Sequence, residues 1–394
     1  MRTIIMAMKI KEAEAFAVIY ESLVNKGFDG MAEAMQTLLN HGMQIEREQH
    51  LNAQAYERTD ERNGYANGFK PKSVKTRIGK LAVQVPQVRD SSFYPLALEK
   101  GLRSERAFAI AIAEMYVKGV STRKVGEIME EMCGTEVSSS QVSAATKSLD
   151  EEFAKWRNRE IGEITYLFVD ARYEKVRMDG HVVSAALFTA IGVTADGKRT
   201  ILGVSVSYSE NEVHWRAFFE SLVARGMHGL KLIISDAHSG LKAARTAVFP
   251  TCPWQRCQFH LQQNAQAYVP RVDMRKKVAA DIRYIFDAPD LEEAKRMLGI
   301  VVKRYEKTAS KLAEWLVENV PETFEVFNFP EEHRKKIRTS NLIERLNKTL
   351  KKRTRVVGIF PNEASCLRLA TGILIEQDEE WMLEDIYMKI NLVG

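Results

Sequence analysis

The chain has 394 residues, of which 45% are hydrophobic and 28% are charged. This composition excludes wholesale disorder, and the length predicts about two or three domains, each with its own core. The four cysteines are too few and too scattered for a disulfide framework, which favours a reducing compartment. The longest nearly apolar run, residues 182–193, is too short to cross a membrane, and the first residues lack a secretory signal pattern. We therefore expect a cytoplasmic protein without a membrane partner.

The net charge of +5 is unevenly distributed along the chain. Residues 331–356 carry ten Lys or Arg against three Glu, residues 58–80 carry seven against two acids, and residues 376–385 carry six acids and no base. Concentrated positive charge suits a polyanion such as nucleic acid. A solvated helix face is an equally good interpretation of charge alone.

The N-terminal part alternates between helical and β patterns. Residues 8–57 show helical spacing of apolar side chains. Residues 58–98 form a small basic β element, because turn signals such as Asn63-Gly64 precede the alternating Leu81, Val83 and Val85.

Residues 99–160 are expected to be helical and to resemble a helix-turn-helix. Ser121 and Ser138 are the predicted N-caps of its last two helices. A unit of this kind commonly docks in a major groove, with Arg123 and Lys124 as candidate DNA contacts. Helical hairpins without a DNA role are at least as common.

The centre of the chain predicts three antiparallel strands, a helix and a fourth strand. The expected strands are residues 164–169, 181–193, 200–206 and 230–234, with a helix beginning at a capping-box pair, Ser209 and Glu212. The first strand ends on Asp170, and the fourth is followed by Asp236. This β-β-β-α-β-α order is that of the ribonuclease H-like α/β fold, in which the first and fourth strands are neighbours. The fold would bring the two aspartates together at the ends of neighbouring strands, which hold side chains rigidly.

A third carboxylate lies on the predicted helix within residues 338–361. The apolar stripe of this helix holds Leu342, Ile343, Leu346 and Leu350, whereas Glu344 lies on the polar face with Asn347, Lys348 and Lys351. A lone Glu there would usually pair with a neighbouring base. Together with the two aspartates it becomes the third ligand of a site for two Mg²⁺ ions, because hard oxygen ligands suit Mg²⁺ and two such ions can catalyse phosphodiester chemistry.

Cysteine and histidine residues also cluster between the second aspartate and the glutamate. Cys252, Cys257 and His260 could be three zinc ligands with a fourth missing. We favour a structural or DNA-positioning role for Cys257 and His260, and a core position for Cys252. Glu210 is a possible auxiliary metal ligand, although the dipole of the following helix also explains it.

The sequence resembles the Mutator-like bacterial insertion-sequence transposases over nearly its whole length. The motifs that carry the resemblance are VDARYEKVR (169–177), SENEVHW (209–215), ISDAHSGL (234–241), WQRCQFHLQQN (254–264) and RTSNLIERLNKTLKKRTRVVGIFPN (338–362), with support from residues 56–72 and 115–125. The resemblance implies a DDE triad of Asp170, Asp236 and Glu344 that binds Mg²⁺, with Mn²⁺ as a possible substitute. It also implies a C-x-x-H motif at Cys257 and His260, and a helical insertion between the second Asp and the Glu.

The family further implies cleavage of double-stranded DNA at terminal inverted repeats and joining of a 3′-hydroxyl to target DNA. A homodimer on DNA, in a bacterial nucleoid, is the corresponding expectation. The candidate DNA-backbone contacts are Arg172, Arg177, Arg338, Arg345, Lys348, Lys351, Lys352 and Arg353. Arg172 and Arg177 could equally belong to a solvated strand end.

The expected domain order follows from these patterns. It comprises an N-terminal helical region (1–57), the small basic β element (58–98), the helix-turn-helix-like domain (99–160), the first part of the catalytic domain (161–268), an all-helical insertion (269–328) and the second part of the catalytic domain (329–394). Two alternatives remain open: a nuclease on the same fold that never joins strands, and a DNA-binding regulator with an idle catalytic site. Only the transposase requires both metal-dependent cleavage and strand joining.

Overall fold

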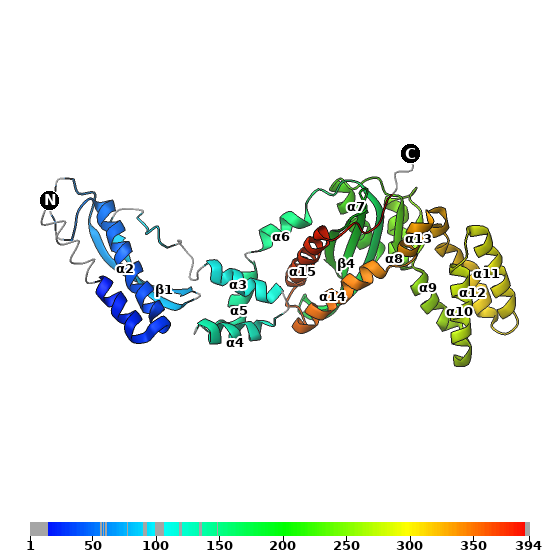
Figure 1. The fold of residues 1–394 in the computed structure, drawn as a ribbon, viewed down its shortest axis with the longest axis horizontal. Coiled ribbons are helices and arrows are strands. Elements are labelled where there is room, and N and C mark those ends of the chain that lie inside the picture. The colour runs from blue at the N-terminus through cyan, green and yellow to red at the C-terminus, as the bar shows by residue number, and fades with distance from the viewer. Residues whose placement is uncertain are drawn as a thin grey trace. The chain divides into compact units, whose positions relative to one another are not determined.

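The computed structural model groups the chain into two compact units, Met1–Tyr116 with Val120–Leu149, and Val117–Gly119 with Asp150–Gly394 (Figure 1). The structure describes residues 15–55, 57, 59, 61–76, 78–89, 93–98, 106–117, 120–133, 136–147 and 149–390. The part of the expected N-terminal helix over residues 8–14 lies outside these. Among the described helices, none combines the length and apolar character that a membrane span requires.

The first unit begins with helices that pack on a β-hairpin. A helix over residues 15–26 and η1 (Gly27–Gly30) precede α2 (Met31–Leu51). The helical pattern expected over residues 8–57 is thus divided near Gly27, which adopts a positive φ of 57°. Strands β1 (Ala66–Thr76) and β2 (Gly79–Val88) are antiparallel. The alternating Leu81, Val83 and Val85 of β2 are buried against Met43 of α2, as the pattern predicted.

Three short helices complete the first unit: α3 (Arg106–Val117), α4 (Thr122–Cys133) and α5 (Ser139–Lys147). The Ser121 hydroxyl accepts the Lys124 N–H and the Ser138 hydroxyl accepts the Gln141 N–H, each at 3.3 Å. Both predicted N-caps are therefore confirmed. Apolar side chains from all three helices form one small core.

The second unit is built on a five-stranded mixed sheet with the order β5-β4-β3-β6-β7. The strands are β3 (Ile164–Met178), β4 (His181–Thr194), β5 (Arg199–Ser207), β6 (Leu232–Ser235) and β7 (Trp254–Arg256). Strands β3, β4 and β5 are successive antiparallel neighbours, and β6 pairs with β3 in parallel. The expected pairing of the first and fourth strands is therefore confirmed.

Helices cover both faces of this sheet. On one face lie α7 (Glu212–Ala224) and α8 (Ser239–Val248), where Trp215, Phe218 and Phe219 stack around Phe188 of β4. The expected capping box was wrong: Asn211 is the N-cap of α7, and its side chain accepts the His214 N–H at 3.1 Å.

The opposite face is covered by α14 (Asn341–Val357) and α15 (Glu363–Leu383), near α6 (Asp150–Arg157). Asp378 of α15 is buried and accepts hydrogen bonds from the Ile201 N–H at 2.7 Å and from the Arg159 guanidinium at 2.7 Å. Arg368 of α15 pairs through two nitrogens with Asp150 of α6. These buried polar contacts fix the C-terminal helices on the sheet.

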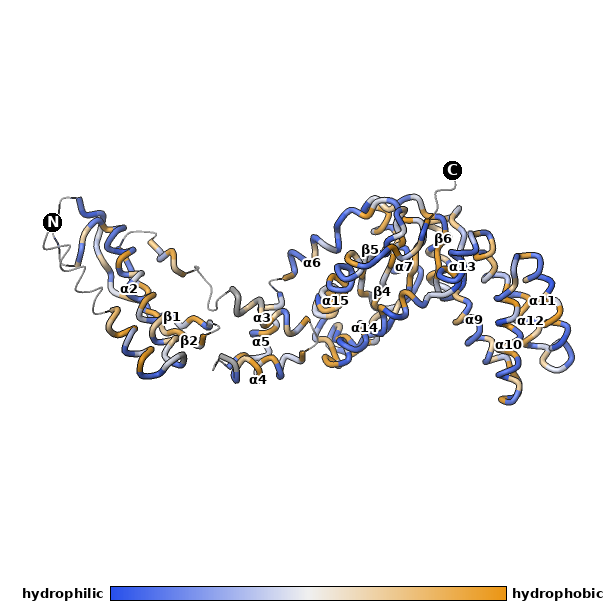
Figure 2. Tube along the Cα trace, in the orientation of Figure 1, coloured by the Kyte–Doolittle hydropathy of each residue, from blue (hydrophilic) through white to orange (hydrophobic). Residues whose placement is uncertain are grey.

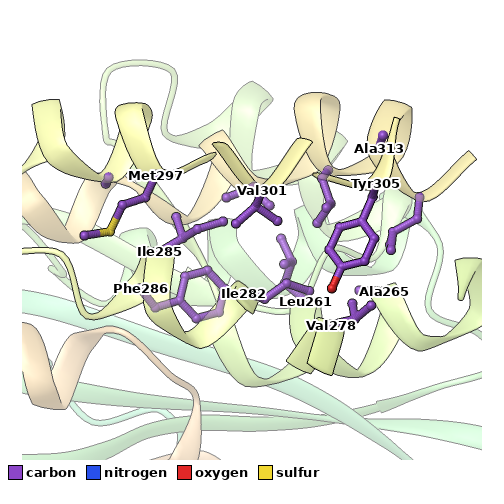
Figure 3. Close-up of a cluster of buried hydrophobic side chains, with 14 of the residues drawn as sticks. Leu261, Ala265, Val278, Ile282, Ile285, Phe286, Met297, Val301, Tyr305 and Ala313 are labelled. Carbon is purple, nitrogen blue, oxygen red and sulfur yellow. The ribbon is translucent and has the colours of Figure 1, made fainter. Parts of the chain in front are cut away.

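A helical segment separates β7 from the C-terminal helices. It comprises α9 (Gln258–Ala265), α10 (Arg275–Phe286), α11 (Leu291–Tyr305), α12 (Ser310–Asn319) and, after the 3₁₀ turns η4 (Val320–Thr323) and η5 (Glu325–Asn328), α13 (Glu331–Ile337). Figure 3 shows its own core, in which Ile282, Ile285 and Val301 face one another. The tube of α11 and α12 alternates between hydrophobic and hydrophilic in Figure 2, as expected for helices with one buried face.

Candidate active site

Two aspartates come from neighbouring parallel strands. The pairing of β3 with β6 ends at Phe168 opposite Ile234. Asp170 and Asp236 each lie two residues further along, so the register places them next to each other on the same side of the sheet. The proximity that the sequence predicted is therefore present, although 66 positions separate the two residues.

Asp170 does not end its strand, contrary to the sequence prediction. Strand β3 continues to Met178, well beyond the last residue of its neighbour β6. The dense charges of residues 170–177 hid this continuation, because they are typical of a strand end, and β3 beyond β6 no longer has strands on both sides.

Helix α14 and the turn after it cover the projecting half of β3. Asn347 contacts Asp170, Thr354 donates to Glu174 at 2.8 Å, and Phe360 exchanges backbone hydrogen bonds with the strand next to Val176. The helix therefore runs beside the strand, with its polar face toward the aspartates.

The carboxylate of Asp170 is held by two neutral donors. The Ala171 N–H donates to Oδ1 at 2.9 Å, and Nδ2 of Asn347 donates to Oδ2 at 2.7 Å. Burial, followed by the negative charge of Asp236, raises the pKa of Asp170 to about 7. A carboxylate that is largely withdrawn from solvent and lies next to another acid is typical of a metal site.

Glu344 is in the first turn of α14. The ring of His260 lies between Glu344 and Asp236. The Ser340 hydroxyl donates to Oε1 of Glu344 at 2.9 Å, and Nε2 of His260 is 3.8 Å from the same oxygen. The expected apolar stripe of α14, from Leu342 to Leu350, is buried. The side chain of Glu344 is one-fifth exposed, which keeps it open to ligands.

Cys257 and His260 bring α9 into this cluster. Cys257 is fully buried, and its sulfur accepts the Ser340 N–H at 3.3 Å. Nδ1 of His260 contacts Oδ1 of Asp236. Burial lowers the pKa of His260, but the Asp236 and Cys257 side chains raise it by more, so the pKa lies well above its usual range. A positively charged ring therefore lies between Asp236 and Glu344.

The cysteine-histidine group differs from the zinc arrangement considered above. Asp236, Cys257 and His260 have ligand atoms that lie within 4.8 Å of one another. Cys252 is instead part of the core under α7 and α8. The spacing of C-x-x-H indicated two members of the cluster, but only the fold could indicate Asp236 as the third.

Glu210 is a fourth carboxylate near the site. Its Oε2 accepts the Tyr173 hydroxyl at 3.2 Å, and Oε1 is 3.7 Å from Nδ1 of His238. Burial raises the pKa of Glu210, and the charge of Asp236 acts in the same direction.

The basic residues fall into two groups. Arg172 pairs with Glu174 at 2.8 Å, Arg338 pairs with Asp287 at 2.9 Å, and Arg353 pairs with Glu376. The second group is exposed and comprises Arg177, Arg345, Lys348, Lys351 and Lys352, with Arg123 and Lys124 in the first unit. Arg355, one turn beyond Lys351 on α14, is also exposed, and the sequence analysis missed it although the helical spacing could have indicated it.

The donor atoms of the site fit a hard divalent cation. Carboxylate oxygens come from three elements, namely β3, the end of β6 and α14, and Oδ1 of Asp236 lies against the His260 ring. The amide oxygen of Asn347 is buried and has no partner among the described residues. Oxygen donors of this kind are the ligands that Mg²⁺ and Mn²⁺ prefer.

Known proteins similar to this chain are transposases. A model of the family described as "Transposase, Mutator family" matches residues 7–384. The transposase for insertion sequence element IS406 of Burkholderia multivorans is 52% identical, with 98% of this chain and 100% of the relative covered. The transposase of ISRM5 from Rhizobium meliloti is 40% identical, with 92% and 91% covered. The transposase of IS256 in transposon Tn4001 from Staphylococcus aureus is 36% identical, with 95% of each covered. A chain from the structure of a simian T-cell lymphotropic virus intasome in complex with PP2A regulatory subunit B56 gamma is 10% identical, with 52% of this chain and 64% of that chain covered, and its TM-score of 0.17 is too low to support a structural argument. The extent of the family match and of the relatives shows that the chain belongs to the Mutator family of transposases.

Proposed function

We propose that the protein cuts double-stranded DNA at the ends of its insertion sequence and joins the resulting 3′-hydroxyl to target DNA. The observation that carries this proposal is the meeting of Asp170, Asp236 and Glu344, from β3, the end of β6 and α14, around His260. A group of neighbouring acids serves poorly as a binding surface for DNA unless cations neutralise it. A role in catalysis explains both the acids and the basic helix beside them.

The strand order supports a ribonuclease H-like fold for the catalytic part. Three antiparallel strands are followed by two parallel ones, and the first strand lies at the centre of the sheet. The helical segment from α10 to α12 lies in the chain between Asp236 and Glu344, at the place of the insertion that the family resemblance implies.

The proposed cofactor is Mg²⁺, with Mn²⁺ as a substitute. When bound, two such ions would activate the attacking oxygen and stabilise the leaving oxygen of the phosphodiester. Asp170, Asp236 and Glu344 would hold the ions, while Ala171 and Asn347 orient the Asp170 carboxylate. His260 lies between Asp236 and Glu344 and reduces their repulsion when no ion is bound.

The proposed partner is duplex DNA, namely the terminal inverted repeats and the target. Exposed cations at Arg345, Lys348, Lys351 and Lys352 project from the helix that carries Glu344. They would attract the phosphates that the acids would otherwise repel. The capped helices α4 and α5 of the first unit offer a second DNA contact, with Arg123 and Lys124 exposed. Handling two element ends calls for a homodimer on DNA.

A strand-transfer assay tests the function directly. An element end with a free 3′-hydroxyl and a plasmid target are incubated in Mg²⁺ with the protein and with Asp170→Ala, Asp236→Ala and Glu344→Ala. Loss of a metal ligand should lower joining by at least about 10³-fold, with end binding retained. Glu318→Ala, an exposed acid of α12, is the matched control and should join like the unchanged protein.

The outcomes separate the alternatives. Cleavage of an uncut end without joining would favour a nuclease. Binding without either reaction would favour a regulator with an idle site. Retained joining by Glu344→Ala alone would remove Glu344 from the site and leave the two aspartates in place.

A further inference from the structure

We infer that Asn347 is a positioning residue of the metal site, which fixes the Asp170 carboxylate for metal binding and adds a buried neutral oxygen next to it. The inference rests on the proposed function, because it concerns the cation that the acids would hold. The charge pattern of α14 does not distinguish Asn347 from an ordinary polar surface residue, whereas the contacts of its side chain do.

The first observation is the hydrogen bond from Nδ2 of Asn347 to Oδ2 of Asp170, at 2.7 Å. When Asp170 is ionised, as cation binding requires, its carboxylate can only accept hydrogen bonds, and the amide then presents its nitrogen to Asp170. The Ala171 N–H donates to Oδ1, so each oxygen of Asp170 accepts one hydrogen bond from a neutral donor. Each oxygen then keeps a lone pair for a cation, and the carboxylate has one orientation.

The second observation is the other end of the same amide. Oδ1 of Asn347 is buried and has no hydrogen-bond partner among the described residues. A buried acceptor without a hydrogen-bond partner is energetically unfavourable, because it has lost its bonds to water. A hydrated divalent cation beside Asp170 would remove this penalty, since the amide oxygen could accept from a metal-bound water or bind the ion itself.

The chemistry of the amide explains why Asn suits this position. A Lys or Arg would form an ion pair with Asp170 and compete with the cation for its charge. An Asp or Glu would place another buried negative charge beside Asp170 and Asp236. Asn347 donates to the carboxylate and leaves its charge available to the metal.

The position on the helix couples two parts of the site. Asn347 is three residues after Glu344, so both side chains project from the same face of α14. A shift of α14 along β3 would therefore move Glu344 and release the Asp170 carboxylate together.

Binding of Mn²⁺ to the full chain without DNA tests the inference, by titration calorimetry or by the loss of the free-ion electron paramagnetic resonance signal. Asn347→Ala removes the amide, and Asn347→Leu removes it while retaining most of the volume. Both should weaken Mn²⁺ binding by about 10-fold or more, with urea midpoints close to that of the unchanged protein. Thr349→Ala on the same helix, whose hydroxyl donates to the Arg345 carbonyl, should bind Mn²⁺ normally.

A double variant distinguishes positioning from packing. If Asn347 acts through Asp170, Asn347→Ala should have no further effect on Mn²⁺ binding in an Asp170→Ala background. Unchanged binding by the Leu variant, additive losses in the double variant, or unfolding of the Ala variant would each overturn the inference. Failure of the unchanged protein to bind Mn²⁺ would instead overturn the proposed metal-dependent function.

Discussion

At Asp170, the protonation state that favours folding differs from the one that the proposed activity requires. Its carboxyl is buried, lies next to Asp236, and has a pKa raised to about 7. In the metal-free protein the folded state therefore holds a proton that the unfolded chain releases near pH 4. Ionisation of Asp170 disfavours the fold, whereas cation binding requires it.

Replacement of Asp170 by Asn should stabilise the metal-free protein at neutral and higher pH. Below about pH 4 the carboxyl is protonated in both states, and the substitution should have little effect. As the pH rises toward about 7, Asp170 ionises in the unfolded state but not in the folded state. The free energy of unfolding of the Asn variant should therefore exceed that of the unchanged protein by a margin that grows to about 2–4 kcal/mol and then levels off. Urea unfolding between pH 4 and 8.5 with a chelator present checks this. A stability difference that is constant with pH would contradict it.

At this residue scale the sequence predicted the acids but not their surroundings. Asp170 and Asp236 follow apolar runs, and Glu344 lies opposite an apolar stripe, so pattern and family resemblance were enough to select them. The hydrogen bond from Thr354 to Glu174 and the contact of Asn347 with Asp170 depend on how α14 lies along β3. Contacts between residues about 180 positions apart leave no periodic signal in one sequence.

At the scale of elements, a glycine determines how closely the loop before α7 approaches the start of α8. A Cβ on Gly240 would lie 2.7 Å from the Glu210 carbonyl oxygen and 2.8 Å from the Glu212 nitrogen. These are backbone atoms that cannot move separately. The close approach places Glu210 near Asp236.

Gly240→Ala should therefore destabilise the protein by about 1–3 kcal/mol and displace Glu210. Gly299→Ala is the matched control, because Gly299 lies in α11 with open space around its Cβ position. The control should stabilise the protein by about 0.5–1 kcal/mol, since Ala favours a helix interior. Urea unfolding of the two variants measures both effects. Equal stability of the two variants would contradict the prediction, because it would show that the backbone near Gly240 can move to accommodate a Cβ atom.

The length of β3 illustrates which elements the sequence could not delimit. Alternation of exposed and buried residues begins after Asp170, where the strand loses its neighbour β6. The charged side chains of that half are typical of a turn or a solvated strand end. The strand continues because β4 remains paired along its whole length and α14 covers the other side.

At the scale of the whole molecule, the charge of α14 should control DNA affinity. A variant with Lys348, Lys351 and Lys352 replaced by Gln should bind DNA more weakly at low salt. If each side chain contacts one phosphate, the slope of log affinity against log salt should fall by about 2.7. Replacement of Lys303, Lys307 and Lys311 by Gln makes the same charge change on α11, on the turn that follows it and on α12. Equal slopes of log affinity against log salt for the two triple variants would show that the DNA does not contact these lysines of α14.

The C-terminal position of Glu344 has a consequence for incomplete copies of the protein. During synthesis the first unit and both aspartates leave the ribosome long before α14 does. A product that stops before Asn341 keeps the helix-turn-helix-like helices and lacks the third acid. On the proposed function, such a product could occupy an element end without cutting it. On the same proposal, a product truncated before α14 is expected to act as an antagonist rather than as an uncontrolled nuclease.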